Sequence, residues 1–92
     1  MARFRTKPFE IQAVRWTGDN EGEMQRFAGA NFLTIPEDER QYTDDPEATA
    51  EVFDKIHSTW ILVQTGQWII RGMKKEFYPC DNEVFESKYE QL

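Results

Sequence analysis

The 92-residue sequence is poor in the residues on which several classes of protein depend. It has one cysteine, Cys80, and one histidine, His57, so an internal disulfide is excluded and a structural zinc site is not expected. No apolar run approaches the roughly 20 residues that a membrane-spanning helix needs, and the first residues lack the apolar core of a signal peptide. These absences predict a soluble protein of a reducing compartment.

Motifs that indicate catalysis are also missing. The phosphate-binding patterns GxGxxG and GxxxxGKS/T are not found, and nothing in the sequence pairs Cys80 with His57 as nucleophile and base. Carboxylates are plentiful between residues 37 and 51, but an irregular segment does not preorganise a catalytic or metal site, and their spacing differs from that of a calcium loop. We therefore expect no catalytic residues, no bound metal and no cofactor.

The net charge of −6 is concentrated in one segment. Residues 37–51 hold seven acidic side chains and one basic side chain, Arg40, so the rest of the chain is neutral. Residues 37–49 also include Pro46 and no apolar periodicity, which predicts an exposed acidic loop. This balance disfavours general nucleic-acid binding, but it allows a small anion to bind in a local pocket.

Apolar periodicity predicts a small α+β domain that spans residues 1–92. Residues 8–16 alternate as a strand does, and Met24, Phe27 and Ala28 have the spacing of a short helix over 21–29, with Asn20 and Glu23 placed as a capping box. Further strands are expected at 31–35, 50–58, 60–64, 68–72 and 76–80, then a short helix capped by Asp81 and a C-terminal strand. The predicted fold is a mainly antiparallel, strongly curved sheet with two short helices.

Chain length and aromatic content bear on assembly and stability. A chain of this size buries a modest core, and 14% of its residues are aromatic. Such a domain is marginally stable alone, so we expect a homo-oligomer that shares apolar surface. Pro79 lacks a backbone donor, so the strand at 76–80 should end there or lie at an edge of the sheet.

The stretch TGQWIIRGMKKEFYPC (65–80) places cations among aromatic residues. Aromatic faces can stack on bases, and arginine pairs with phosphate through two hydrogen bonds. The tryptophans could equally be core residues and the lysines simple turn residues, whereas Arg71 is the least ordinary of the set. The candidate ligand-binding residues are Arg15, Trp16, Trp68, Arg71, Lys74 and Tyr78.

Two segments, KPFEIQAVRWTGDN (7–20) and GQWIIRGMKKEFYPCDNEVFESKYE (66–90), resemble a widespread family of small tailed-phage proteins. The shared positions are Lys7, Pro8, Trp16 to Gly18, Gly66, Trp68 to Gly72, Glu76 to Cys80, and Tyr89 with Glu90. The chain departs from the family pattern at Gln67, where aspartate is usual, at Arg71, where lysine is usual, and in its long acidic insert. The resemblance implies a non-virion accessory protein of the host bacterial cytoplasm, with no catalytic role.

Three functions are compatible with these observations. The first is a non-enzymatic binding protein for a small anionic ligand, such as a sponge that sequesters a cyclic nucleotide or another nucleotide-derived defence signal; several unrelated small phage proteins act in this way. The second is an inhibitor that binds a host protein through the acidic loop. The third is an enzyme that degrades such a signal.

Overall fold

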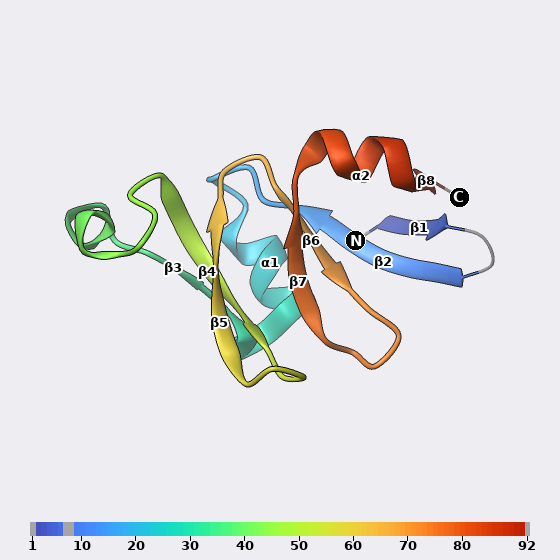
Figure 1. Ribbon diagram of the computed structural model, residues 1–92, viewed down its shortest axis with the longest axis horizontal. Helices are drawn as coiled ribbons and strands as arrows, with labels where there is room; N and C mark the ends of the chain where they lie inside the picture. Colours follow the sequence, from blue (N-terminus) through green and yellow to red (C-terminus); the bar gives the residue numbers. More distant parts are fainter. Residues whose placement is uncertain (1, 7–8, 92) are drawn as a thin grey trace.

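The computed structural model describes residues 2–6 and 9–91 and has the predicted α+β class, with antiparallel sheets and two short α-helices (Figure 1). Two short 3-10 helices, η1 and η2, complete the secondary structure of the described residues. The elements in chain order are β1 (Ala2–Thr6), β2 (Phe9–Arg15), α1 (Glu21–Ala28), η1 (Gly29–Asn31), β3 (Phe32–Thr34), η2 (Glu37–Tyr42), β4 (Ala48–Asp54), β5 (Thr59–Gln64), β6 (Trp68–Arg71), β7 (Phe77–Cys80), α2 (Asn82–Lys88) and β8 (Glu90–Gln91).

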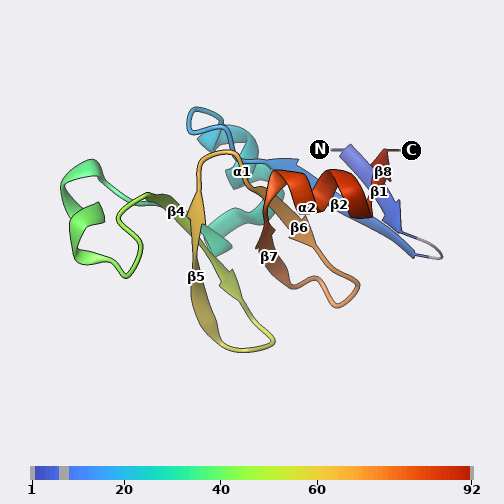
Figure 2. The same ribbon diagram turned by 45° about the horizontal axis from the view of Figure 1, so that its top comes forward.

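The strands form two sheets. A five-stranded sheet has the order β7-β6-β2-β1-β8, and a three-stranded sheet has the order β3-β4-β5. Adjacent strands are antiparallel in both. Figures 1 and 2 show the three-stranded sheet at one end of the molecule and the β1-β2 hairpin at the other, with strong curvature and no closed barrel.

The five-stranded sheet separates two apolar cores. Its first face packs with α1 against the three-stranded sheet, and the residues of this larger core include Val14, Phe27 and Ile69. Its second face is covered by α2, whose Phe85 packs on Phe4. Because side chains alternate along a strand, neighbouring residues of β2 and β6 contribute to different cores.

The N-terminal strand and the helix caps differ from the sequence prediction. No strand is predicted for residues 2–6, yet they pair with β2 and β8 as β1. The predicted capping box at α1 is wrong, because the Asn20 side chain accepts from the Thr17 N–H and donates to Glu23 instead of capping the helix. Asp81 does precede α2, but its carboxylate accepts a hydrogen bond from Gln67 rather than capping the helix through its side chain.

Two further boundaries follow from local chemistry. The strand predicted at 50–58 starts earlier and ends at Asp54, because the Asp54 carboxylate accepts the N–H groups of Ile56 and His57 and turns the chain. The acidic segment predicted as a loop begins with η2. β7 contains Pro79 and lies at an edge of the five-stranded sheet, as its missing backbone donor requires. Lys7 and Pro8 of the first motif lie outside the described residues.

Candidate functional site

The pairing of β2 with β6 decides which predicted site residues can meet. Gln12 lies opposite Arg71, and Arg15 lies opposite Trp68, three positions further along each strand. Since side chains alternate between the faces of a sheet, Arg71 projects from one face and Trp68 from the other. Tyr78, opposite Ile70, shares the face of Trp68. The six predicted residues therefore do not form a single site.

The two tryptophans of the predicted site have structural partners. Trp16 is 2% exposed, and its indole N–H donates to Thr49 Oγ1 at 2.8 Å. Trp68 stacks on Phe85 with ring centroids 4.1 Å apart, and its indole N–H donates to Asn82 Oδ1. Both rings therefore serve the packing of the domain, and stacking on a ligand would require Trp16 to leave the core.

Arg15 and Trp68 are the two predicted residues that share a hollow on their side of the sheet. Its volume is about 420 Å³, and its lining includes Ala13 and the carboxylate-bearing Glu23. The Arg15 Nε donates to the Gly66 carbonyl at 2.9 Å. With one cation beside one carboxylate, this hollow offers an anion little net attraction.

Tyr78 and Lys74 line neither the hollow of Arg15 and Trp68 nor the one next to Arg71. Tyr78 is half-buried, and burial together with nearby Tyr89 raises the pKa of its phenol well above the usual value. Lys74 is exposed in the turn between β6 and β7, where its backbone N–H donates to Glu76 Oε2. Neither residue lines the hollow next to Arg71.

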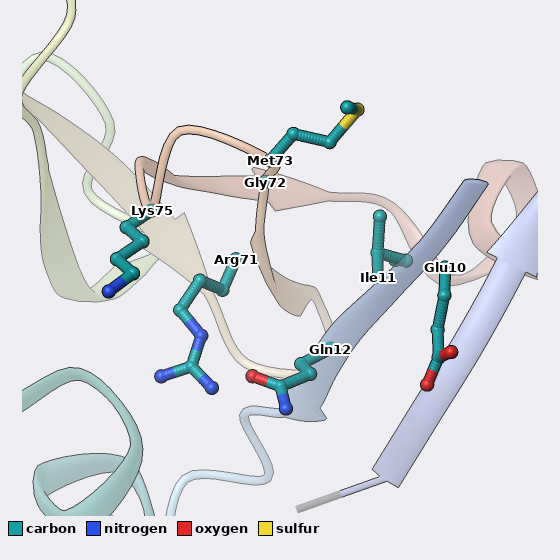
Figure 3. A pocket seen from close by; sticks show the side chains of 7 residues that line it. All are labelled: Glu10, Ile11, Gln12, Arg71, Gly72, Met73 and Lys75. Atoms are coloured by element: carbon teal, nitrogen blue, oxygen red, sulfur yellow. The ribbon is translucent and has the colours of Figure 1, made fainter.

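The hollow next to Arg71 is the candidate site of this chain. Its volume is about 520 Å³, and it lies over β2, the end of β6 and the following turn. Figure 3 shows the polar ends of Lys75, Arg71 and Gln12 on one side, in that order, with Glu10 beyond Gln12. Met73 projects in the opposite direction. Two cations and an amide thus present hydrogen-bond donors side by side.

Surrounding charges make this side of the sheet basic. Glu10 is neutralised in part by Arg3, whose guanidinium lies 3.4 Å from its carboxylate. The guanidinium of Arg71 lies over the Phe27 ring at 5.1 Å from its centroid, a cation-π contact that orients it. A second hollow of about 320 Å³ adjoins Arg71 and includes Arg26 and Glu23. The Glu76 carboxylate also lies against Gly72 of the first hollow. Counting Lys75, four cations therefore lie around the two hollows with three carboxylates.

The residues that sequence patterns associate with nucleophilic catalysis lie apart. Cys80 belongs to β7, and burial raises the pKa of its thiol, which disfavours the reactive thiolate. His57 lies in the turn after β4, where its Nδ1 is 2.7 Å from Asp54 Oδ2. Within residues 2–6 and 9–91, three or more His, Cys, Asp or Glu side chains do not gather as a metal site would require.

Sequence reasoning identified Arg71 but missed its neighbours. The predicted site residues include Lys74 but neither Gln12 nor Lys75, whereas Gln12 and Lys75 line the hollow and Lys74 does not. The register of β2 with β6 brings Gln12 beside Arg71, and no pattern in the sequence specifies that register. Lys75 adopts a left-handed backbone conformation with φ of 62°, which directs its side chain differently from that of Lys74.

Comparison of the chain with protein-family models, with curated proteins and with solved structures finds no match. The resemblance to small tailed-phage proteins therefore stays a prediction from the two quoted segments. In the part of the chain that the structure describes, no helix is both long enough and apolar enough to cross a membrane.

Proposed function

We propose that this protein is a non-enzymatic bacteriophage accessory protein that binds a small anionic ligand in the hollow next to Arg71. The observation that carries the proposal is the row of donors from Lys75, Arg71 and Gln12 along one open hollow. A guanidinium binds a phosphate or carboxylate through two parallel hydrogen bonds. The neighbouring ammonium and amide add further donors to the same anion.

The charge distribution favours an anion at this position. The chain carries −6 overall, yet four cations lie around the two hollows against three carboxylates. The cations are Arg3, Arg26, Arg71 and Lys75, and the carboxylates are those of Glu10, Glu23 and Glu76. A local excess of positive charge on an acidic protein attracts a small anion while the remaining surface repels polyanions such as DNA. This agrees with a small ligand rather than a nucleic acid.

The hollow favours recognition of charge over recognition of a base. Trp16 and Trp68 lie elsewhere, so stacking between them is not part of the proposal. The ligand is a phosphate-bearing small molecule, and nucleotide-derived defence signals belong to that class. A sponge that holds such a signal would bind it without turnover, and a homo-oligomer would present several copies of the hollow.

Isothermal titration calorimetry tests this function with inorganic pyrophosphate, a panel of cyclic dinucleotides and cyclic ADP-ribose products. Lys75→Gln should weaken binding of the best ligand at least about tenfold, since a charge-assisted hydrogen bond contributes about 1.5–3 kcal/mol. Lys74→Gln removes the same charge from the adjacent turn position and should change the affinity less than about threefold.

Three outcomes would contradict the proposal. If no ligand of the panel produced a binding heat, the protein would not bind these anions. Equal losses of affinity in Lys75→Gln and Lys74→Gln would show that the ligand does not bind in this hollow. Recovery of the bound ligand unchanged after heat denaturation separates binding from turnover, because an enzyme would release product.

A further inference from the structure

The outer face of the three-stranded sheet exposes large apolar side chains. We define it by Leu33 of β3, Phe53 of β4, and Trp60 and Leu62 of β5. Leu33 is 44% exposed and Trp60 is 41% exposed, while Phe53 and Leu62 are half-buried. The opposite face of β4 is buried in the larger core through Ala50 and Val52. Several large apolar side chains on one exposed sheet face mark an interaction site more often than isolated surface leucines do.

Strand register brings these side chains together in two rows. Glu51 pairs with Leu33 on one side and with Leu62 on the other, so the three residues cross the sheet in one line. Phe53 pairs with Trp60 in the next line, and their ring centroids are 5.4 Å apart. The outer face is therefore apolar, with one carboxylate in its middle.

A hollow lies where this face meets the acidic segment. The segment after β3 projects beyond the sheet (green in Figures 1 and 2). Between it and the sheet is a hollow of about 570 Å³, with Leu33 and Tyr42 among its apolar lining and Glu39 and Glu51 among its charged lining. Tyr42 is 82% exposed, so an aromatic ring extends this surface beyond the strands.

The charge around the outer face is strongly negative. Residues 37–51 carry the whole net charge of −6. The ion pairs of Arg3 with Glu10 and of Asp54 with His57 lie outside this segment. Glu37, Asp38 and Glu39 of this segment are exposed, so their carboxylates can reach cations of a partner.

We propose that the outer face binds a basic amphipathic segment of another protein. The partner places apolar side chains on Leu33, Leu62 and Trp60, and its lysines or arginines pair with Glu51 and the acidic segment. Contacts on the Trp60 ring supply most of the binding free energy, and the leucine contacts exclude water around it. The charged rim increases the association rate and selects basic partners. The face lies on the other sheet from the Arg71 hollow and does not depend on it.

Charge complementarity favours this occupant over a second copy of the chain. A twofold dimer brings the same patch of each copy together. Two outer faces in contact would bring two acidic segments of −6 charge close to each other, and each Glu51 would lose water without gaining a cation. A basic segment removes both penalties.

Titration with synthetic peptides tests the proposal on the ¹⁵N-labelled full chain. The probe is an amphipathic peptide of about two helical heptads, with leucines on one face and lysines elsewhere. It should shift the amide signals of Leu33, Glu51, Phe53, Trp60 and Leu62. A peptide with its leucines replaced by serines should bind at least about tenfold more weakly, and one with its lysines replaced by glutamates should not bind.

Two protein variants locate the binding surface. Leu33→Lys should reduce the affinity for the basic peptide about tenfold or more, because it removes an apolar contact and adds a repulsive charge. The matched control is Val84→Lys, which makes the same charge change at an exposed valine of α2 (50% exposed) and should leave the affinity within about twofold. Thermal unfolding of both variants checks that each remains folded.

Each contrary result overturns the proposal. Equal binding of the leucine and serine peptides would mean that only diffuse charge attraction acts. Shifts confined to residues outside the outer face, or equal losses in Leu33→Lys and Val84→Lys, would place the contact elsewhere. If Leu33→Lys instead dissociates an oligomer of this chain in sedimentation velocity, the outer face is covered by a second copy.

Discussion

Trp60 and Trp68 occupy strands of different sheets, and only Trp68 is covered by a helix. Trp68 lies under α2, where Phe85 stacks on it and Asn82 accepts its indole hydrogen bond. Trp60 lies on the outer face, where it packs beside Phe53 of the neighbouring strand and remains 41% exposed. Helix α2 covers the face of the five-stranded sheet from which Trp68 projects. The outer face of the three-stranded sheet is open to solvent.

This difference teaches which apolar surface is structural and which is available. The second core depends on Phe85, which is 2% exposed and contacts Phe4, Trp68 and Tyr89. Burial of that ring holds α2 against the sheet and stabilises the fold by about 1.5–3 kcal/mol. The outer face of the three-stranded sheet has no comparable ring above it among the described residues. Its apolar groups are therefore available for a partner.

The largest predicted effect on stability comes from removing the ring that holds α2 on the five-stranded sheet. Phe85→Ala leaves a cavity between α2, Phe4 and Trp68, and should lower the free energy of unfolding by about 3–5 kcal/mol. Urea unfolding monitored by tryptophan fluorescence measures it. A loss below about 1 kcal/mol would mean that α2 contributes little to the fold, and the two sheet faces would then be equivalent.

The comparison is sharpened by truncating each tryptophan in turn. Trp68→Ala should lower the free energy of unfolding by about 3 kcal/mol, since it removes a stacked ring and leaves Asn82 without its donor. Trp60→Ala should lower it by about 1 kcal/mol, the scale of an exposed cross-strand aromatic pair. Urea unfolding of both variants provides the ratio. Similar losses would show that Trp60 also supports the core.

The smallest predicted effects concern pH, and they differ between the sheets. In the three-stranded sheet, the hydrogen bond from His57 to Asp54 lowers the pKa of that carboxyl below its ordinary value of 3.8. Its stabilising contribution is present above that pH and is lost as the carboxylate protonates in acid. Asp54→Asn should therefore be less stable than the parent at pH 6 and should lose less stability between pH 6 and pH 3.

The five-stranded sheet has the opposite dependence. Burial raises the pKa of Tyr78 above the ordinary value of 10, so its contribution is present below pH 10 and is lost as the pH rises further. Tyr78→Phe should flatten the loss of stability above pH 10 and leave the acid side unchanged. Thermal unfolding from pH 3 to pH 11 measures both variants. Identical profiles of the two variants would refute this assignment of the titrating groups.

Local elements of the fold could be predicted from the sequence because they depend on near neighbours. The apolar spacing of Met24, Phe27 and Ala28 corresponds to α1, and all three are buried. The missing donor of Pro79 placed its strand at an edge. The candidate site was predictable only in part. Arg71 stood out as a cation after an apolar run, but Gln12 meets it through a strand register between residues far apart in the sequence.

The sequence by itself determined the α+β class, most of the strands and the concentration of negative charge in one segment, because alternation, turn residues and charge are local properties. Tertiary structure alone decided the division into two sheets, the pairing of β1, and which aromatic rings are covered. Alternation tells which side chains share a face of a strand, but not what packs on that face. Trp60 and Trp68 begin similar apolar runs, and only the chain-distant Phe85 makes one structural and leaves the other exposed.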